Sequence, residues 1–244
     1  MKSILIITLR ELNSFFDSLI AYIILALLLG FTGFLTWIRG FGNSDVFMLN
    51  QATLAQFIGV AYWTLFFIIP ALTMRLIAEE KKTGTIELLL TKAISDRQVV
   101  IGKFLSTLLL ICIALLLTLP YVITIASIGN LDLGEVICGY LGLILMSATY
   151  ISIGLYASSI TSNQIVAFLA TLFIGLFFHI IFDLLKGAAT GFIGDFFSML
   201  SLSTHFESIA RGVVDSKDII YFLSIIILGL FLTEVSLSKR KISG

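Results

Sequence analysis

Uncharged apolar runs long enough to cross a bilayer recur along the whole chain. In a soluble protein the same residues would be spread at helical or strand periods, with polar residues between them. A window of about 20 residues, the length of a helix that crosses the hydrocarbon core, predicts six membrane-spanning helices. The predicted spans are residues 18–38, 56–77, 104–125, 136–160, 165–185 and 219–237. We therefore expect an all-α membrane protein in which residues 1–244 form a single transmembrane domain.

Residues 1–17, before the first span, have an amphipathic pattern. On a helical wheel, four apolar side chains form one narrow stripe: Leu5, Leu9, Leu12 and Phe16. The opposite side carries Arg10, Ser14 and Asp17. This pattern favours an interfacial (elbow) helix in the membrane plane; the alternative is the ragged start of a longer first helix. A signal peptide is not favoured, because polar residues interrupt the first apolar run and no clear cleavage site follows the second.

The composition supports the membrane assignment and narrows the function. The chain is 59% hydrophobic and 12% charged, whereas about a quarter of the residues of a soluble domain are charged. The net charge of zero gives no basic field that would attract nucleic acid. Cys112 and Cys138 lie in or beside apolar runs without CxxC spacing, so we expect neither a disulfide framework nor a thiolate metal site.

Lysine and arginine are distributed unequally between the two sides of a six-span protein. Of the 15 such residues, all but four fall in or beside the two terminal segments and the loop between the second and third spans. The four on the opposite side are Arg39, Lys186, Arg211 and Lys217. By the positive-inside rule, both termini and that loop are expected in the cytoplasm, with the protein in the inner (cytoplasmic) membrane.

The loop over residues 78–97 concentrates charge between two apolar spans. Gly84 ends the helix that leaves the membrane, Thr85 can cap a new helix, and Glu87 falls in its first turn. This short cytosolic helix, over residues 86–91, carries more apolar side chains than a solvated turn leaves exposed. They either meet a partner or dip into the lipid interface. Ser95 and Gln98 then form a capping-box pattern that predicts the start of the third membrane helix.

These motifs resemble, in order, those of the permease subunits of ABC-2-type ABC transporters, most closely the gliding-motility-associated ABC permease group. The residues that carry the resemblance in the loop are Glu79-Glu80, Gly84-Thr85, Glu87 with Leu88-Leu89, and Ile94-Ser95. Residues 154–168 resemble the group's tight turn between spans four and five, and residues 205–215 resemble its outer segment before the last span. The likeness covers nearly the whole chain. One departure is Ala93, where the family often has proline.

The resemblance implies that the short helix is a coupling helix seated in a groove of a separate cytosolic ABC ATPase subunit. The ATPase contact would consist of Glu79, Glu80, Thr83, Gly84, Thr85, Ile86, Glu87, Leu88 and Leu89. The chain has no GxxxxGK[ST] motif and no cytosolic segment long enough for a nucleotide domain. We therefore expect no catalytic residue, no cofactor and no enzyme activity in this chain. A second permease chain, identical or different, is also implied, with membrane lipid around the spans.

A few polar or helix-breaking residues inside the spans are candidates for the pathway. Pro70 and Pro120 each remove a backbone donor, and each marks either packing geometry or a gating hinge. His179 and Asp183, four residues apart, share a helical face. They form either a proton relay or an interfacial cluster that reaches water. In the outer segment, residues 187–218, His205 has too few neighbouring ligands to build a metal site.

The expected function is therefore a permease subunit that exports an envelope-related substrate with energy from a separate ATPase. Two alternatives remain at this point. An ion-coupled secondary carrier would use His179 and Asp183, and a membrane scaffold would transport nothing.

Overall fold

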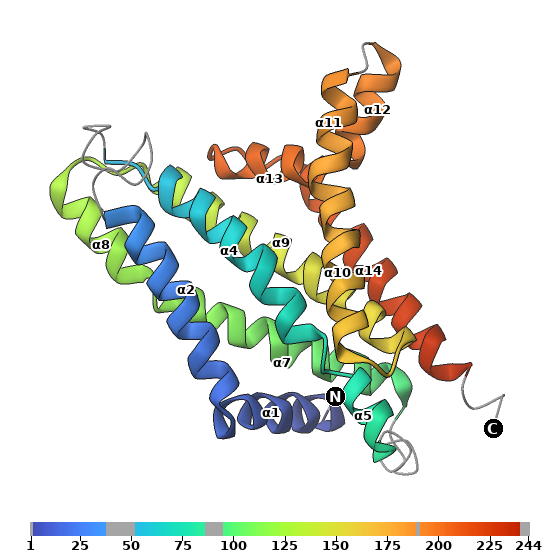
Figure 1. Cartoon of the computed structure of the whole chain (residues 1–244). Helices are drawn as coiled ribbons and strands as arrows, with labels where there is room; N and C mark the ends of the chain where they lie inside the picture. The colour runs from blue at the N-terminus through green and yellow to red at the C-terminus, as the bar shows by residue number, and fades with distance from the viewer. Residues whose placement is uncertain (1, 38–51, 86–94, 189–190, 240–244) are drawn as a thin grey trace.

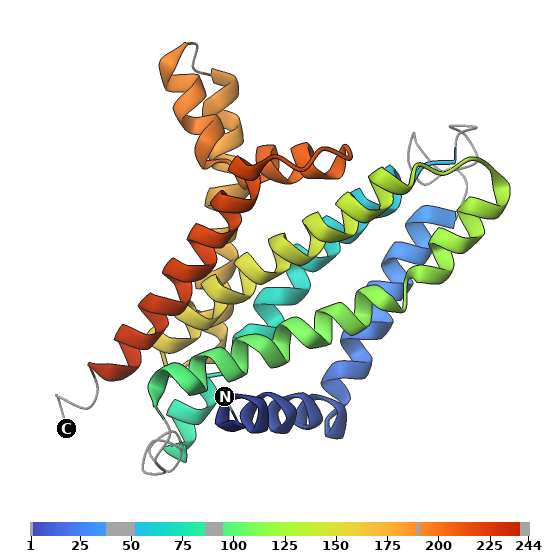
Figure 2. The same ribbon diagram turned by 180° about the vertical axis from the view of Figure 1, so that it is seen from behind.

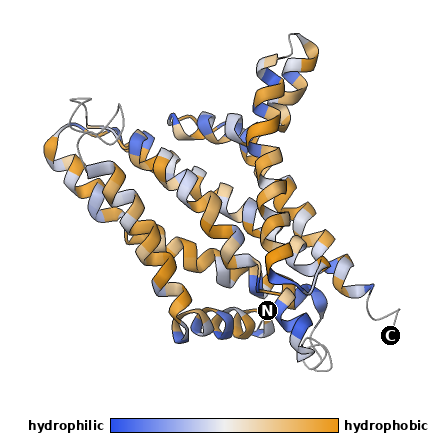
Figure 3. Cartoon of the chain, viewed as in Figure 1, coloured by the Kyte–Doolittle hydropathy of each residue, from blue (hydrophilic) through white to orange (hydrophobic). Residues whose placement is uncertain are grey.

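The computed structural model describes residues 2–37, 52–85, 95–188 and 191–239, and over these ranges it contains helices and no strand. Six helical stretches are long and apolar enough to cross a membrane, which confirms the all-α, six-span prediction. They are Leu19–Trp37, Ala55–Thr83, Asp96–Ile128, Leu133–Ile160, Gln164–Ala188 and Ser216–Ser238. Figure 3 shows that these stretches are mainly hydrophobic and that hydrophilic residues gather at one end of the bundle, near the N-terminus.

Helix α9 (Leu133–Ile160) lies at the centre of the bundle. It packs against α4 (Ala55–Thr73), α7 (Asp96–Leu116), α10 (Gln164–Leu176) and α14 (Ser216–Ser238). The two opposite views in Figures 1 and 2 both place α9 between α4 and α14. Small residues allow this close packing, as is usual between membrane helices. A Cβ on Gly154 of α9, for example, would lie 2.1 Å from Thr73 Oγ1 of α4.

Helix α1 (Lys2–Asp17) is separate from α2 (Leu19–Trp37) and is turned steeply away from it (Figure 1). A bend at Ser18 separates them, and Ser18 Oγ donates to the carbonyl of Phe15 at 3.0 Å. This break favours the elbow helix over one longer first helix. The apolar stripe is exposed at Leu5 (63%) and Leu9, while Ile7 packs against α7.

Both spans that contain a proline are interrupted near it. After Pro70, α4 ends at Thr73, and α5 (Ala78–Thr83) follows a four-residue turn. In the third span, α7 ends at Leu116 and α8 (Leu119–Ile128) has Pro120 in its first turn. A proline in a first turn sacrifices no intrahelical hydrogen bond, because the donors there have no intrahelical partner.

The fifth span and the segment after it are built from short helices. Helix α10 continues through a π-helical turn, η1 (Phe177–Ile181), into α11 (Phe182–Ala188). Helix α12 (Phe192–Leu200) packs against α11, and the two project from the bundle at the top of Figure 1. Helix α13 (Leu202–Ala210) then lies across the end of α9 before α14 begins.

Candidate coupling site

Helix α5 is fastened to α9 at the break in the second span. The backbone N–H groups of Ile77 and Ala78, which have no partner inside α5, donate to Ser158 Oγ at 3.1 and 2.9 Å. Ser158 Oγ in turn donates to the carbonyl of Met74 at 3.0 Å. All of these groups lie in a buried or half-buried part of the bundle, where an unpaired backbone donor would be costly. One serine hydroxyl therefore closes the helix break.

The end of α9 also joins α5 to the last span. The ammonium of Lys81 in α5 donates to the carbonyl of Ser159. Ser236 Oγ of α14 donates to the same carbonyl at 3.1 Å. Ser158 and Ser159 together thus connect three elements that are distant in the sequence.

A buried ion-pair cluster connects α5 to α1 and α7. Lys103 of α7 is only 1% exposed, and its Nζ lies 2.7 Å from Glu80 Oε1 of α5 and 3.4 Å from Glu11 Oε2 of α1. Arg10 adds a second cation, 2.6 Å from Glu11 Oε1. Burial raises the pKa of the Glu11 carboxyl, but the charge of Lys103, with the hydrogen bond and charge of Arg10, outweighs burial and holds that pKa below its usual range. Glu80 Oε2 is buried and has no hydrogen-bond partner among the described residues.

A polar cavity of ≈ 390 Å³ lies between α1, α5 and α7. Its wall includes the four members of the Lys103 cluster, which are Lys103, Glu80, Glu11 and Arg10. It also includes the Arg75–Glu79 pair, whose Nε and Oε2 atoms are 3.3 Å apart. The lining residues are Arg10, Glu11, Ser14, Phe15, Arg75, Leu76, Glu79, Glu80, Thr83, Thr85 and Lys103. The cavity therefore contains three basic and three acidic side chains at the end of α5.

The structure describes five of the nine residues predicted to contact an ATPase. Glu79 is half-buried and paired with Arg75, whereas Glu80 is bound to Lys103 inside the bundle. Thr83 Oγ1 donates to the carbonyl of Glu79 at 2.9 Å.

The end of α5 matches the sequence prediction. Gly84 has φ of 71° and ends α5 in the left-handed conformation that glycine adopts without strain. Thr85 is exposed, and its hydroxyl lies 2.9 Å from that of Thr83. The remaining predicted contact residues, Ile86, Glu87, Leu88 and Leu89, fall outside the described residues, as does the rest of the predicted coupling helix. The capping box at Ser95 and Gln98 is present, and α7 begins at Asp96 as predicted.

A protein-family model described as "ABC-2 family transporter protein" matches residues 38–206, more than half of the chain. The chain belongs to this ABC-2 family. It is therefore a multi-pass membrane protein of the ABC-transporter permease type. The matched region contains α5, the break that precedes it and the end of α9. No curated protein matches the chain.

Sequence reasoning missed Lys103, Glu11 and Ser158 as parts of this site. Lys103 had a visible signal, since it is a charge next to an apolar run and a charge near a membrane is rarely left without a partner. Ser158 had none, because a serine inside an apolar helix commonly bonds to its own backbone. Only the fold brings residue 158 beside residues 77 and 78.

His179 and Asp183, which were predicted to share a helical face, lie in different environments. His179 lies on η1 and is only 3% exposed, which does not fit the alternative in which both side chains form an interfacial cluster that reaches water. Asp183 is half exposed, 3.8 Å from Lys186. The π-helical turn between them departs from the 3.6-residue period on which the shared face was predicted.

His205 in the outer segment pairs with a residue other than the neighbouring Glu207. Its Nδ1 lies 2.7 Å from Asp218 Oδ1 and its Nε2 lies 3.0 Å from the carbonyl of Met199. Glu207 forms an exposed pair with Arg211 at 3.3 Å. Both ring nitrogens of His205 are therefore engaged within the protein.

Proposed function

We propose that this protein is the membrane-spanning permease subunit of an ATP-driven ABC-2-type transporter, and that its loop over residues 78–97 docks on a separate cytosolic ABC ATPase. The observation that carries the proposal is the attachment of α5 to three other helices at one end of the bundle. Ser158 ties α5 to α9, and Lys103 ties it to α7 and α1. Family membership supports the same assignment.

This attachment suits a segment that passes a movement of the ATPase on to the membrane helices. If α5 hung freely from α4, a displacement of the loop would be absorbed by the turn over residues 74–77. Instead, the Lys103 cluster and Ser158 make that displacement costly unless α1, α7 and α9 move with α5. A movement of the ATPase would then reach helices that cross the whole bundle.

The finer parts of the proposal rest on the sequence. The distribution of lysine and arginine supports an inner-membrane protein with both termini and the α5 end in the cytoplasm. The loop motifs support the gliding-motility-associated group, a second permease chain as partner and export of an envelope-related substrate. In this arrangement ATP is hydrolysed by the partner, and the permease itself needs no cofactor.

The two alternative functions gain less support. A secondary carrier needs His179 and Asp183 to act together, but one is buried and the other is half exposed beside Lys186. A scaffold that transports nothing has no need for a charged cluster buried beneath the loop.

The decisive experiment is co-purification from native membranes in mild detergent, with identification of bound proteins by mass spectrometry. Wild type is compared with Glu87→Arg in the loop and with the control Asp195→Arg, which changes an exposed acid on α12. We expect an ABC ATPase with wild type and with the control, and its loss from Glu87→Arg. Absence of an ATPase from all three samples, each eluting as a folded protein on gel filtration, would refute the proposal.

A further inference from the structure

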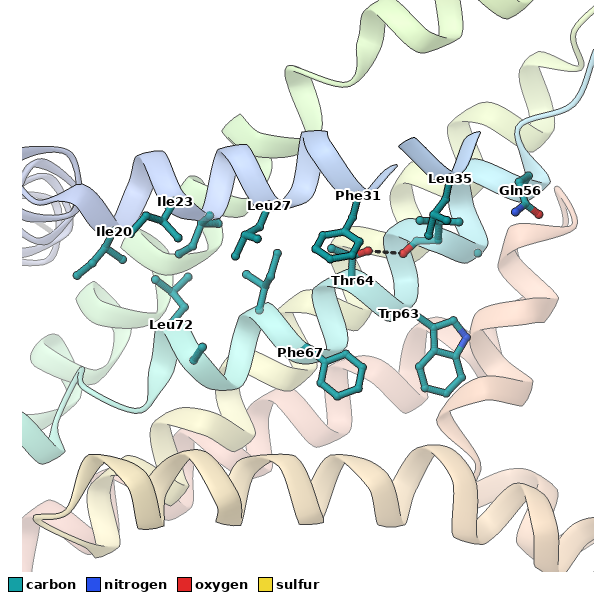
Figure 4. A pocket seen from close by; sticks show the side chains of 15 residues that line it. Ile20, Ile23, Leu27, Phe31, Leu35, Gln56, Trp63, Thr64, Phe67 and Leu72 are labelled. Atoms are coloured by element: carbon teal, nitrogen blue, oxygen red, sulfur yellow. Dashed lines mark hydrogen bonds between the residues drawn. The ribbon is translucent and has the colours of Figure 1, made fainter. Parts of the chain in front are cut away.

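Two cavities of different chemistry meet at α4. An apolar groove of ≈ 800 Å³ lies between α2 and α4, and Figure 4 shows side chains such as Leu27 and Phe31 extending from α2 toward α4. A second cavity of ≈ 310 Å³ lies between α4, η1, α11 and α13. Both are lined by Gly59 and Trp63. The two spaces therefore adjoin along one face of α4.

The lining of the apolar groove suits a hydrocarbon chain. It contains no charged side chain, and its polar lining residues are Gln56 and Thr64. The Thr64 hydroxyl already donates to the carbonyl of Val60 at 2.7 Å. The remaining lining residues are aliphatic, aromatic or glycine, among them Leu27, Phe31, Phe67 and Leu72.

The smaller cavity offers a hydrogen-bond donor from His179. Nδ1 of His179 lies 2.7 Å from Tyr62 Oη and 3.1 Å from Tyr150 Oη. Among the described residues, the Tyr62 hydroxyl has no other hydrogen-bond partner, so it donates its hydrogen to Nδ1. The hydrogen of the neutral imidazole is then on Nε2, which has no partner in the described part of the chain. Because the ring lines the cavity, Nε2 can donate to an oxygen bound there.

The same cavity is acidic and aromatic. Asp183 and Glu207 line it, and its lining contains no lysine or arginine. Lys186 and Arg211 pair with these carboxylates on the exposed side, at 3.8 and 3.3 Å. Tyr62 is stacked between His179 and Phe206, and the aromatic walls that remain for an ammonium group are those of Trp63 and Phe206. This lining favours a cation and disfavours a group with net negative charge.

We propose that the two cavities together bind one phospholipid with a protonated amine in its headgroup, of the phosphatidylethanolamine type. The ammonium lies near Asp183 and Glu207, a phosphate oxygen accepts a hydrogen bond from His179 Nε2–H, and an acyl chain occupies the groove between α2 and α4. In the orientation proposed above, this end of α4 faces the outer leaflet. The site does not depend on coupling to an ATPase, so it stands or falls separately from the proposed function.

The chain provides its own fluorescent probe. Its two tryptophans are Trp37 and Trp63, so Trp37→Phe leaves Trp63, at the junction of the cavities, as the only one. This protein is placed in nanodiscs that contain phosphatidylethanolamine and phosphatidylglycerol in fixed proportion. In one sample the acyl chains of phosphatidylethanolamine are brominated near the glycerol. In the other sample the acyl chains of phosphatidylglycerol are brominated at the same place. We expect brominated phosphatidylethanolamine to quench Trp63 severalfold more strongly.

Two sets of variants separate specific binding from ordinary contact with the bilayer. A Cβ on Gly59 meets no atom within 4 Å, so the side chain of Gly59→Leu starts in open space at the junction, where it should exclude lipid and abolish the preference. Gly30→Leu is the matched control, since Gly30 is equally open but lies outside both cavities. Asp183→Asn with Glu207→Gln should also make the quenching by the two lipids equal. This double variant adds no bulk at the junction, so it tests the proposal even if Gly59→Leu fails to fold.

Equal quenching by both brominated lipids in the Trp37→Phe protein would overturn the proposal, as would a preference that survives the two carboxylate substitutions. Weak quenching by both lipids would also overturn it, because it would show that protein rather than lipid covers Trp63.

Discussion

The two proline-containing spans are interrupted in similar places but held in different ways. At the first break, Ile77 and Ala78 are buried and bonded to Ser158, and the Lys103 cluster fixes the helix that follows. At the second, Thr118 Oγ1 bonds to the carbonyl of Leu115 at 2.6 Å and meets Tyr140 Oη at 2.7 Å, with Leu117 exposed beside it. A displacement at the first break is passed to three other helices, whereas the second break can bend more independently.

The largest effect is expected from Lys103→Met, which removes the cation that holds α5, α7 and α1 together. Glu80 and Glu11 would lose that buried partner, and breaking a buried ion pair in this way costs about 3–5 kcal/mol. The unfolding free energy in detergent, followed by fluorescence during denaturant titration, measures the loss. Adding Glu80→Gln should restore part of it. If Lys103→Met alone were as stable as wild type, the cluster would not fix α5.

Ser158→Ala tests the hydrogen bonds at the first break against those at the second. It leaves two buried N–H groups without their acceptor, at a cost of about 1–3 kcal/mol. The matched variant Thr118→Ala removes a hydroxyl whose loss strands no backbone donor, and about 0.5–1.5 kcal/mol is expected. The same unfolding assay compares them. Equal costs, or a larger cost for Thr118→Ala, would contradict the distinction between the breaks.

The contribution of Glu11 should depend on pH. Because the folded-state pKa of its carboxyl is lowered, its stabilising effect is fully present above the unfolded value of about 4.3 and is lost as pH falls through the lower folded value. The difference in unfolding free energy between wild type and Glu11→Gln should therefore be constant near neutral pH and shrink in acid. A difference that grows on acidification would reverse the sign and refute the assignment.

The smallest effects concern the prolines themselves. Pro120 is exposed in the first turn of α8, so Pro120→Ala should change the unfolding free energy by no more than about 0.5 kcal/mol. Pro70 is buried, and Pro70→Ala leaves a void, so its cost should be larger. The reverse order in the unfolding assay would show that the second break, rather than the first, is the constrained one.

Sequence patterns predicted the features that are local in the chain. Six apolar runs gave six spans, Gly84 ends α5, and Ser95 with Gln98 caps α7. The contacts that make up the candidate site were not predictable in this way, because they join Glu11, Glu80 and Lys103 across three helices. The burial of His179 was missed for another reason: a π-helical turn changes which side chains face the bundle, and helical periodicity assumes a constant repeat.

The serine that closes the first break also bears on how the protein is made. Residues 77 and 78 are synthesised about 80 residues before Ser158. When α4 and α5 are made, these two backbone donors therefore still lack the acceptor that the fourth span supplies in the folded protein. Because lipid offers such donors no partner, the nascent second span should hold this region at the water interface until α9 has inserted. The first break would thus close only after the fourth span has been made.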